Sequence, residues 1–146
     1  MRIGIVVSRF NDFVTERLLT GAQATIREAG VPDDDVVLLR VPGAFEIPIA
    51  AQRLAETSRV DAVICLGCLI RGATPHFEYI ASACAHGITA AAAATGVPMT
   101  FGVLTTNSVE EALERAAPGD GNKGREAALA AIDLIRTLHT LDDRRR

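Results

Sequence analysis

The chain has 146 residues, a net charge of −3 at pH 7 and a hydrophobic content of 49%. This length suits one domain over 1–146, and the acidic balance argues against nucleic acid as a partner. No apolar run approaches the roughly 20 residues that a membrane helix needs, and Met1 leads directly into a strand-like segment, without room for a signal peptide. We therefore expect a cytoplasmic protein whose surplus apolar surface lies between subunits.

Two hydrophobic periodicities alternate along the chain. Short apolar, β-branched runs predict strands buried on both faces, and apolar residues three and four apart predict helices. In chain order we predict a strand over 3–7, a helix over about 12–29, a strand over 36–41 and a helix over about 46–56. A strand over 62–66, a helix over about 75–95 and a strand over 99–104 follow. Ser108 then opens a helix with Glu111 placed for a capping box, and a Gly-rich connection over 118–124 precedes a last helix over about 125–141.

Strand and helix repeated four times, with a final helix, predict an α/β fold with a four-stranded parallel sheet and helices on both faces. We expect the flavodoxin-like strand order 2-1-3-4. Ligands of such sheets bind beyond the carboxyl ends of the strands. The segments at those ends hold most of the residues suited to chemistry, and they span 8–11, 42–46, 70–77 and 105–108.

The third of these segments is the most informative. Thr74 suits a helix N-cap and Pro75 the first helical position, and the free N–H groups of such a helix start attract anions. His76 would then lie in the first turn beside the anion site, where a histidine can carry protons near neutral pH. From these residues alone, a capping or packing role for His76 is equally compatible. His86 and His139 lie within helices and are predicted to be surface residues.

Aromatic and charged residues in the other loops also have two interpretations. Phe10 and Phe45 could sandwich a planar heterocycle or anchor their loops to the core. Glu46 could bind a polyol or complement a helix dipole. Arg115 and Lys123, the only lysine, could bind phosphate or act as a capping arginine and a loop lysine. The stretch around Lys123 does not match a P-loop.

Three cysteines are present, and Cys65 and Cys68 have a C-x-x-C spacing. A zinc site usually needs about four ligands, and no second pair exists. Redox motifs of this type open a helix, whereas this pair ends an apolar strand. We predict buried, inert thiols. The three arginines over 144–146 are predicted to form a solvated basic end.

Six stretches of the chain resemble the lumazine synthase family, and they occur in the order of that family. They read SRFN at 8–11, VPGAFEIP at 41–48, GCLIRGATPHF at 67–77, GVLTT at 102–106, ERA at 114–116 and GNKG at 121–124. The resemblance covers almost the whole chain, and several blocks in register are far more specific than one.

The resemblance implies an activity without a cofactor or metal. A ribitylamino-pyrimidinedione condenses with a dihydroxybutanone phosphate to give 6,7-dimethyl-8-ribityllumazine. Phe10 would stack on the pyrimidine, the backbone of Ala44, Phe45, Leu69 and Ile70 would border it, and Glu46 would bind the ribityl hydroxyls. Ala73 and Thr74 would hold the phosphate and His76 would move protons. The neighbouring subunit would supply Phe101, Arg115 and Lys123.

The resemblance also implies a homopentamer, and leaves open both an icosahedral shell of pentamers and an association with riboflavin synthase. Members of the family commonly carry an extra N-terminal strand that pairs with a neighbour, and this chain starts almost at its first strand, which argues against a shell. The short connection over 118–121 is similar to that of shell formers. Two alternatives remain open: a riboflavin synthase of the archaeal type, and a lumazine- or flavin-binding protein without catalysis.

Overall fold

The computed structural model describes residues 1–143, so the predicted basic end over 144–146 lies outside the described residues. The strands are β1 (Ile3–Ser8), β2 (Val36–Val41), β3 (Ala62–Ile70) and β4 (Met99–Thr106). The helices are α1 (Asp12–Glu28), α2 (Ile47–Glu56), α3 (His76–Thr95), α4 (Val109–Arg115) and α5 (Lys123–Asp143), with 3-10 turns at Asp33–Asp35 and Ala44–Glu46.

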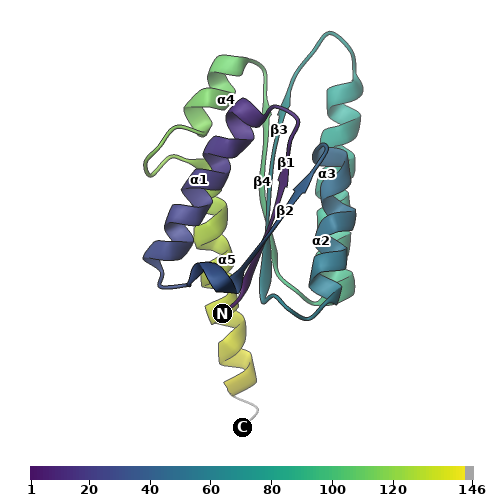
Figure 1. The fold of residues 1–146 in the computed structure, drawn as a ribbon. Coiled ribbons are helices and arrows are strands. Elements are labelled where there is room, and N and C mark those ends of the chain that lie inside the picture. Colours follow the sequence, from purple (N-terminus) through teal and green to yellow (C-terminus); the bar gives the residue numbers. More distant parts are fainter. Residues whose placement is uncertain (144–146) are drawn as a thin grey trace.

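The four strands form one sheet in the order β2-β1-β3-β4, and every neighbouring pair is parallel. This confirms the predicted fold and strand order. Helices α1, α4 and α5 cover one face of the sheet, and α2 and α3 cover the other (Figure 1). Because the strands are parallel, all four carboxyl ends meet at one edge, at the top of Figure 1.

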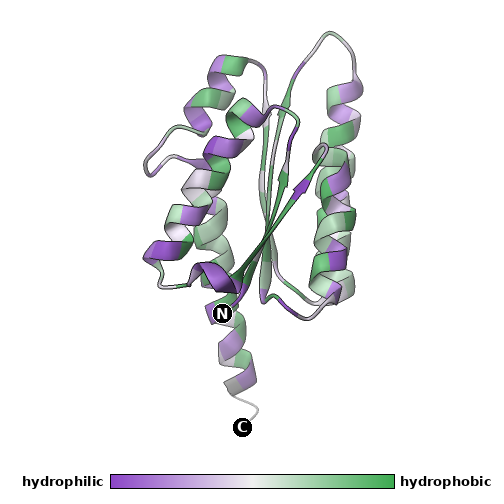
Figure 2. Cartoon of the chain, viewed as in Figure 1, coloured by the Kyte–Doolittle hydropathy of each residue, from purple (hydrophilic) through white to green (hydrophobic). Residues whose placement is uncertain are grey.

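The core consists of two apolar layers separated by the sheet. On β1, Ile5 and Val7 pack in the layer under α1 and α5, whereas Val6 packs in the layer under α2. Successive strand residues point to opposite faces, so a strand covered on both sides must be apolar throughout. Figure 2 shows the strands as mostly hydrophobic bands between helices that mix hydrophobic and hydrophilic residues. Burying one such Ile or Val side chain stabilises the fold by about 1.5–3 kcal/mol.

Two strands are longer than predicted. β3 ends at Ile70 and β4 at Thr106, where these two residues are register partners, rather than at 66 and 104 as predicted. The added part of β3 is apolar and buried, whereas the added part of β4, Thr105 and Thr106, is polar and follows β3 through backbone pairing. Among residues 1–143, no helix is long and apolar enough to cross a bilayer.

Two predicted helix starts are corrected. Helix α3 begins at His76, and its N-cap is Pro75 without a side-chain cap hydrogen bond, so the prediction of Thr74 as N-cap is wrong. Helix α5 begins at Lys123 and not at 125. The predicted N-cap of α4 is confirmed, since Ser108 Oγ accepts from the backbone N–H of Glu111 at 3.1 Å. The predicted capping box is corrected, because the Glu111 carboxylate accepts from the N–H of Asn107, at 2.9 Å, one residue before the N-cap.

The two cysteines of the C-x-x-C pair point away from each other. Cys65 packs in the layer on the α2 and α3 side of the sheet and Cys68 in the layer on the α1 side, as residues three apart in a strand must. They therefore cannot share a metal ion or form a disulfide with each other. Burial raises the pKa of the Cys68 and Cys84 thiols to about 11 and raises the pKa of Cys65 further.

We predict that none of these thiols reacts rapidly in the folded protein at pH 8. With a pKa of about 11, roughly 0.1% of a thiol is the reactive thiolate at that pH, and burial blocks access. A chromogenic aromatic disulfide should therefore label all three cysteines in denaturant and none within minutes in native buffer. Fast labelling of any cysteine in the folded protein would contradict this assignment.

Candidate functional site

The loop after β1 is tied to both neighbouring strands and projects Phe10 outward. The backbone N–H of Phe10 donates to Pro42 O at 2.9 Å, and Asn11 Nδ2 donates to Cys68 O at 2.9 Å. Asn11 has a left-handed backbone with φ 62°, which asparagine tolerates better than most residues. Phe10 is 65% exposed. Its backbone is therefore held in place while its ring remains mostly uncovered by the rest of the chain.

The turn after β2 presents a second exposed aromatic residue. The N–H of Glu46 donates to Gly43 O at 3.2 Å, and Phe45 is 63% exposed. Ile47 is fully buried and anchors this turn. A Cβ on Gly67 would come within 3.1 Å of Ile47 Cδ1, so a glycine in β3 allows α2 to start close to the sheet.

Arg71 holds the loop between β3 and α3 at three points. Its N–H donates to Thr106 O at 2.8 Å, its Nε donates to Asn107 Oδ1 at 3.0 Å, and its guanidinium pairs with Glu78 at 2.8 Å. The same guanidinium lies 4.7 Å from the centroid of the Phe77 ring, a cation–π distance. Arg71 thereby fixes the loop that carries Thr74 and leads into His76.

The exposed side chains of these three loops face one cavity of about 960 Å³. It is lined by eight of the predicted site residues: Phe10, Ala44, Phe45, Glu46, Leu69, Ile70, Thr74 and His76. Ala73 is exposed on the same loop and does not line it. The cavity therefore combines four aromatic rings, those of Phe10, Phe45, Phe77 and Tyr79, with one carboxylate and one imidazole. It also includes the open start of a 20-residue helix, which favours negative charge.

One wall of this cavity is not among the residues predicted from the sequence. Tyr79, Ile80 and Ala83 line it from α3. They follow His76 at spacings of three, four and seven residues, which is the spacing of one helix face. That periodicity was a signal available in the sequence, and it identifies Tyr79, which is 70% exposed, as a further aromatic residue of the site.

The remaining predicted residues lie elsewhere. Phe101, Arg115 and Lys123 line a second hollow of about 350 Å³ along β4, and Glu126 and Thr105 line it as well. Arg115 pairs with Glu111 at 3.6 Å, and Lys123 pairs with Glu126 at 3.0 Å. Glu126 was not predicted as a site residue, although its position three residues after Lys123 on a helix predicts such a pair.

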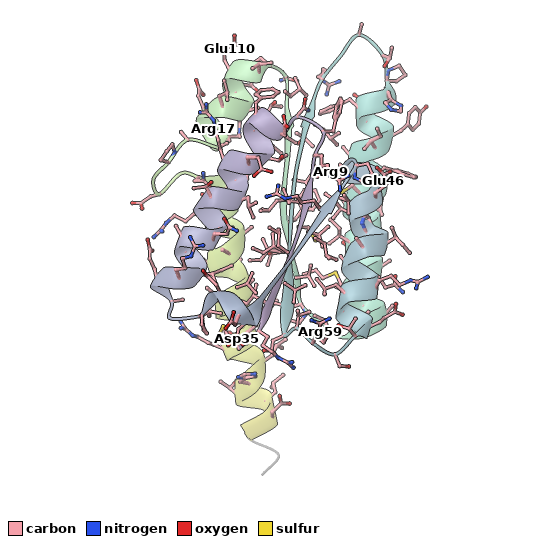
Figure 3. All side chains as sticks on the ribbon, viewed as in Figure 1. Arg9, Arg17, Asp35, Glu46, Arg59 and Glu110 are labelled. Atoms are coloured by element: carbon pink, nitrogen blue, oxygen red, sulfur yellow. The ribbon has the colours of Figure 1, made fainter. Side chains whose placement is uncertain are left out.

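The two hollows share no lining residue. The larger one lies at the loops on the α2 and α3 side, where Figure 3 shows Glu46, and the smaller one lies between the free edge of β4 and α5. One chain therefore does not bring His76 together with Arg115 and Lys123. Over residues 1–143, no group of three or more His, Cys, Asp or Glu is placed to hold a metal ion.

The chain is similar to known proteins over nearly its whole length. A family model described as 6,7-dimethyl-8-ribityllumazine synthase matches residues 1–139. The protein of that name from Syntrophus aciditrophicus (strain SB) is 51% identical over 97% of this chain and 92% of its own length. Its counterpart from Halorhodospira halophila (strain DSM 244 / SL1) is 48% identical over 97% and 90%.

A de novo designed Rossmann fold protein, 24% identical, matches with a TM-score of 0.41 over 78% of this chain and 92% of its own. The family model and the two curated relatives all extend over nearly the whole chain. The chain therefore belongs to the 6,7-dimethyl-8-ribityllumazine synthase family.

Proposed function

We propose that this protein catalyses the formation of 6,7-dimethyl-8-ribityllumazine in riboflavin biosynthesis. The substrates are 5-amino-6-(ribitylamino)pyrimidinedione and 3,4-dihydroxy-2-butanone 4-phosphate, and the other products are one phosphate and two waters. Family membership supports this proposal, and so does one geometric observation. Eight residues predicted to serve this reaction, from three separate segments of the chain, line a single cavity.

The cavity offers suitable contacts for the pyrimidine substrate. We assign stacking on the heterocycle to Phe10, whose ring is exposed at the cavity wall. The backbone at Ala44, Phe45, Leu69 and Ile70 borders the ring edge. The Glu46 carboxylate accepts hydrogen bonds from the ribityl hydroxyls. Tyr79 adds a further aromatic surface from α3.

The phosphorylated substrate needs an anion site and a proton carrier. Ala73 and Thr74 precede the start of α3, whose free N–H groups favour a phosphate, and Arg115 from a second subunit supplies a guanidinium. His76, the first residue of α3, carries protons as the imine forms and the phosphate leaves. Two waters are released, one at imine formation and one at ring closure. Both substrates are reactive, so positioning supplies much of the rate.

We further propose that each active site is shared between two subunits of a homopentamer. His76 and Arg115 lie in separate hollows of one chain, and β4 is an edge strand with an exposed Phe101. A head-to-tail ring brings one surface of each subunit against a different surface of the next, which joins the two hollows into one site. Native mass spectrometry would distinguish a pentamer from a shell of twelve pentamers. The same measurement would show whether riboflavin synthase is bound.

The purified protein should form lumazine from both substrates without added metal or cofactor. The measurement is the absorbance of the product in the presence of a chelator. Activity that is lost with the chelator and restored by zinc would overturn the assignment. Riboflavin formation from two lumazines, without the phosphorylated butanone, would favour a riboflavin synthase, and ligand binding without turnover would favour a binding protein.

Arg115→Lys should weaken the phosphorylated substrate and spare the pyrimidine. A guanidinium binds a phosphate through two parallel hydrogen bonds, and an ammonium binds it as a point charge. We expect a higher KM for the butanone phosphate and an unchanged KM for the pyrimidine. Arg53→Lys, in α2 outside both hollows, is the control. Equal weakening of both substrates by Arg115→Lys would refute the assignment.

Two inactive variants should restore each other if the site is shared. One variant carries Phe10→Ala with His76→Ala, and the other carries Arg115→Ala. In a random equal mixture, roughly a quarter of the interfaces of a head-to-tail ring join two intact halves. Refolding the variants together should therefore return about a quarter of wild-type activity, while each variant refolded alone stays inactive. If mass spectrometry shows mixed rings without activity, all the residues act within one chain.

A further inference from the structure

We propose that Asn122 is a positioning residue that sets the distance between Arg115 and Lys123, and thereby the affinity of their hollow for phosphate. The inference rests on the proposed function only where it names phosphate as the ligand. Asn122 directly precedes Lys123, and it contacts Ala116, which directly follows Arg115. Its side chain therefore lies between the two helix ends that carry the cations.

One amide group satisfies both helix ends. Asn122 Nδ2 donates to Ala116 O, the C-cap carbonyl of α4, at 2.9 Å. Asn122 Oδ1 accepts from the N–H of Arg125, the third residue of α5, at 3.0 Å. This is an N-cap bond for α5 and a C-terminal bond for α4, and helix ends leave such groups unpaired otherwise.

The same amide is also held against α1. Asn122 Nδ2 lies 3.4 Å from Arg17 O, and Figure 3 shows Arg17 on α1, on the side of the sheet away from Glu46. The side chain is 2% exposed. Both polar atoms of this buried amide, Nδ2 and Oδ1, form hydrogen bonds with backbone groups. A shift of Asn122 would therefore leave buried polar groups without partners.

Two glycines allow this close approach. A Cβ on Gly21 of α1 would collide with Asn122 Oδ1, and a Cβ on Gly124 would collide with the carbonyl oxygen of Leu18. The first turn of α5 thus rests directly on the backbone of α1. Among the described residues, Lys123 and Arg115 pair with groups on their own helices, Lys123 with Glu126 and Arg115 with the carboxylate and backbone carbonyl of Glu111. The backbone, fixed through Asn122, therefore determines where the two cations lie.

The first test is Asn122→Asp, which keeps the acceptor for Arg125 N–H and replaces the donor that faces Ala116 O and Arg17 O. Loss of one hydrogen bond between a charged side chain and a phosphate weakens binding by about tenfold or more. We therefore expect the assembled variant to bind inorganic phosphate at least about tenfold more weakly by calorimetry. The KM for the butanone phosphate should rise in parallel, and the KM for the pyrimidine should not change.

A matched pair of glycine variants moves Asn122 without altering it. Gly21→Ala pushes a methyl group into Asn122 Oδ1, whereas Gly121→Ala, one residue before Asn122, meets nothing within 4 Å. Gly21→Ala should weaken phosphate as Asn122→Asp does, and Gly121→Ala should leave it unchanged. Val60→Ala, a buried substitution at the opposite end of the sheet, controls for general loss of stability.

The inference is wrong if Asn122→Asp and Gly21→Ala keep wild-type phosphate affinity, or if they weaken both substrates equally. It is also wrong if neither variant folds, because Asn122 then supports the fold as a whole. The proposed function is tested separately. If the wild-type protein binds inorganic phosphate but forms no lumazine, the proposed function is wrong, and the role of Asn122 in phosphate binding still stands. If the wild-type protein forms lumazine and the variants bind phosphate normally, only the proposed role of Asn122 is wrong.

Discussion

The burial of β1 and β3 on both faces is the constraint on which the rest of the structure depends. Strands that are apolar on both sides must be covered by helices on both sides, so each strand returns to the start of the next through a helix. This connection makes all strands parallel and collects their carboxyl ends at one edge. Phe10, Phe45 and His76 come from three distant parts of the chain and meet at that edge because of it.

Much of this could be predicted from the sequence. Apolar runs such as 3–7 and 62–66 show which segments are buried strands, and the alternation with helices determines the topology. Because the edge of a parallel sheet is defined by topology, the convergence of Glu46 and His76 was predictable without knowledge of any distance. The face of α3 that carries Tyr79 was predictable as well, from its spacing to His76.

Other features depend on contacts that no local pattern contains. The start of α5 depends on the bonds of Asn122 to α4 and α1, and Asn122 and Arg17 are 105 residues apart in the chain. The ends of β3 and β4 depend on their mutual pairing, as at Ile70 and Thr106. Threonine is a residue type favoured at helix N-caps, which made Thr74 the predicted cap of α3. Arg71 ties the loop to α3 and to the residue after β4, and in that loop Pro75 takes the N-cap position instead.

The smaller hollow combines fixed backbone positions with charged side chains in weak ion pairs. Arg115 and Lys123 pair with Glu111 and Glu126 in exposed ion pairs, and such pairs contribute about 0–1 kcal/mol. In the proposed site, a phosphate with two negative charges would therefore displace those carboxylates at little cost. Weak pairing alone would let the two cations occupy many positions. In our proposal the buried amide of Asn122 holds the backbone of both helix ends, so the two side chains would change partners from fixed backbone positions.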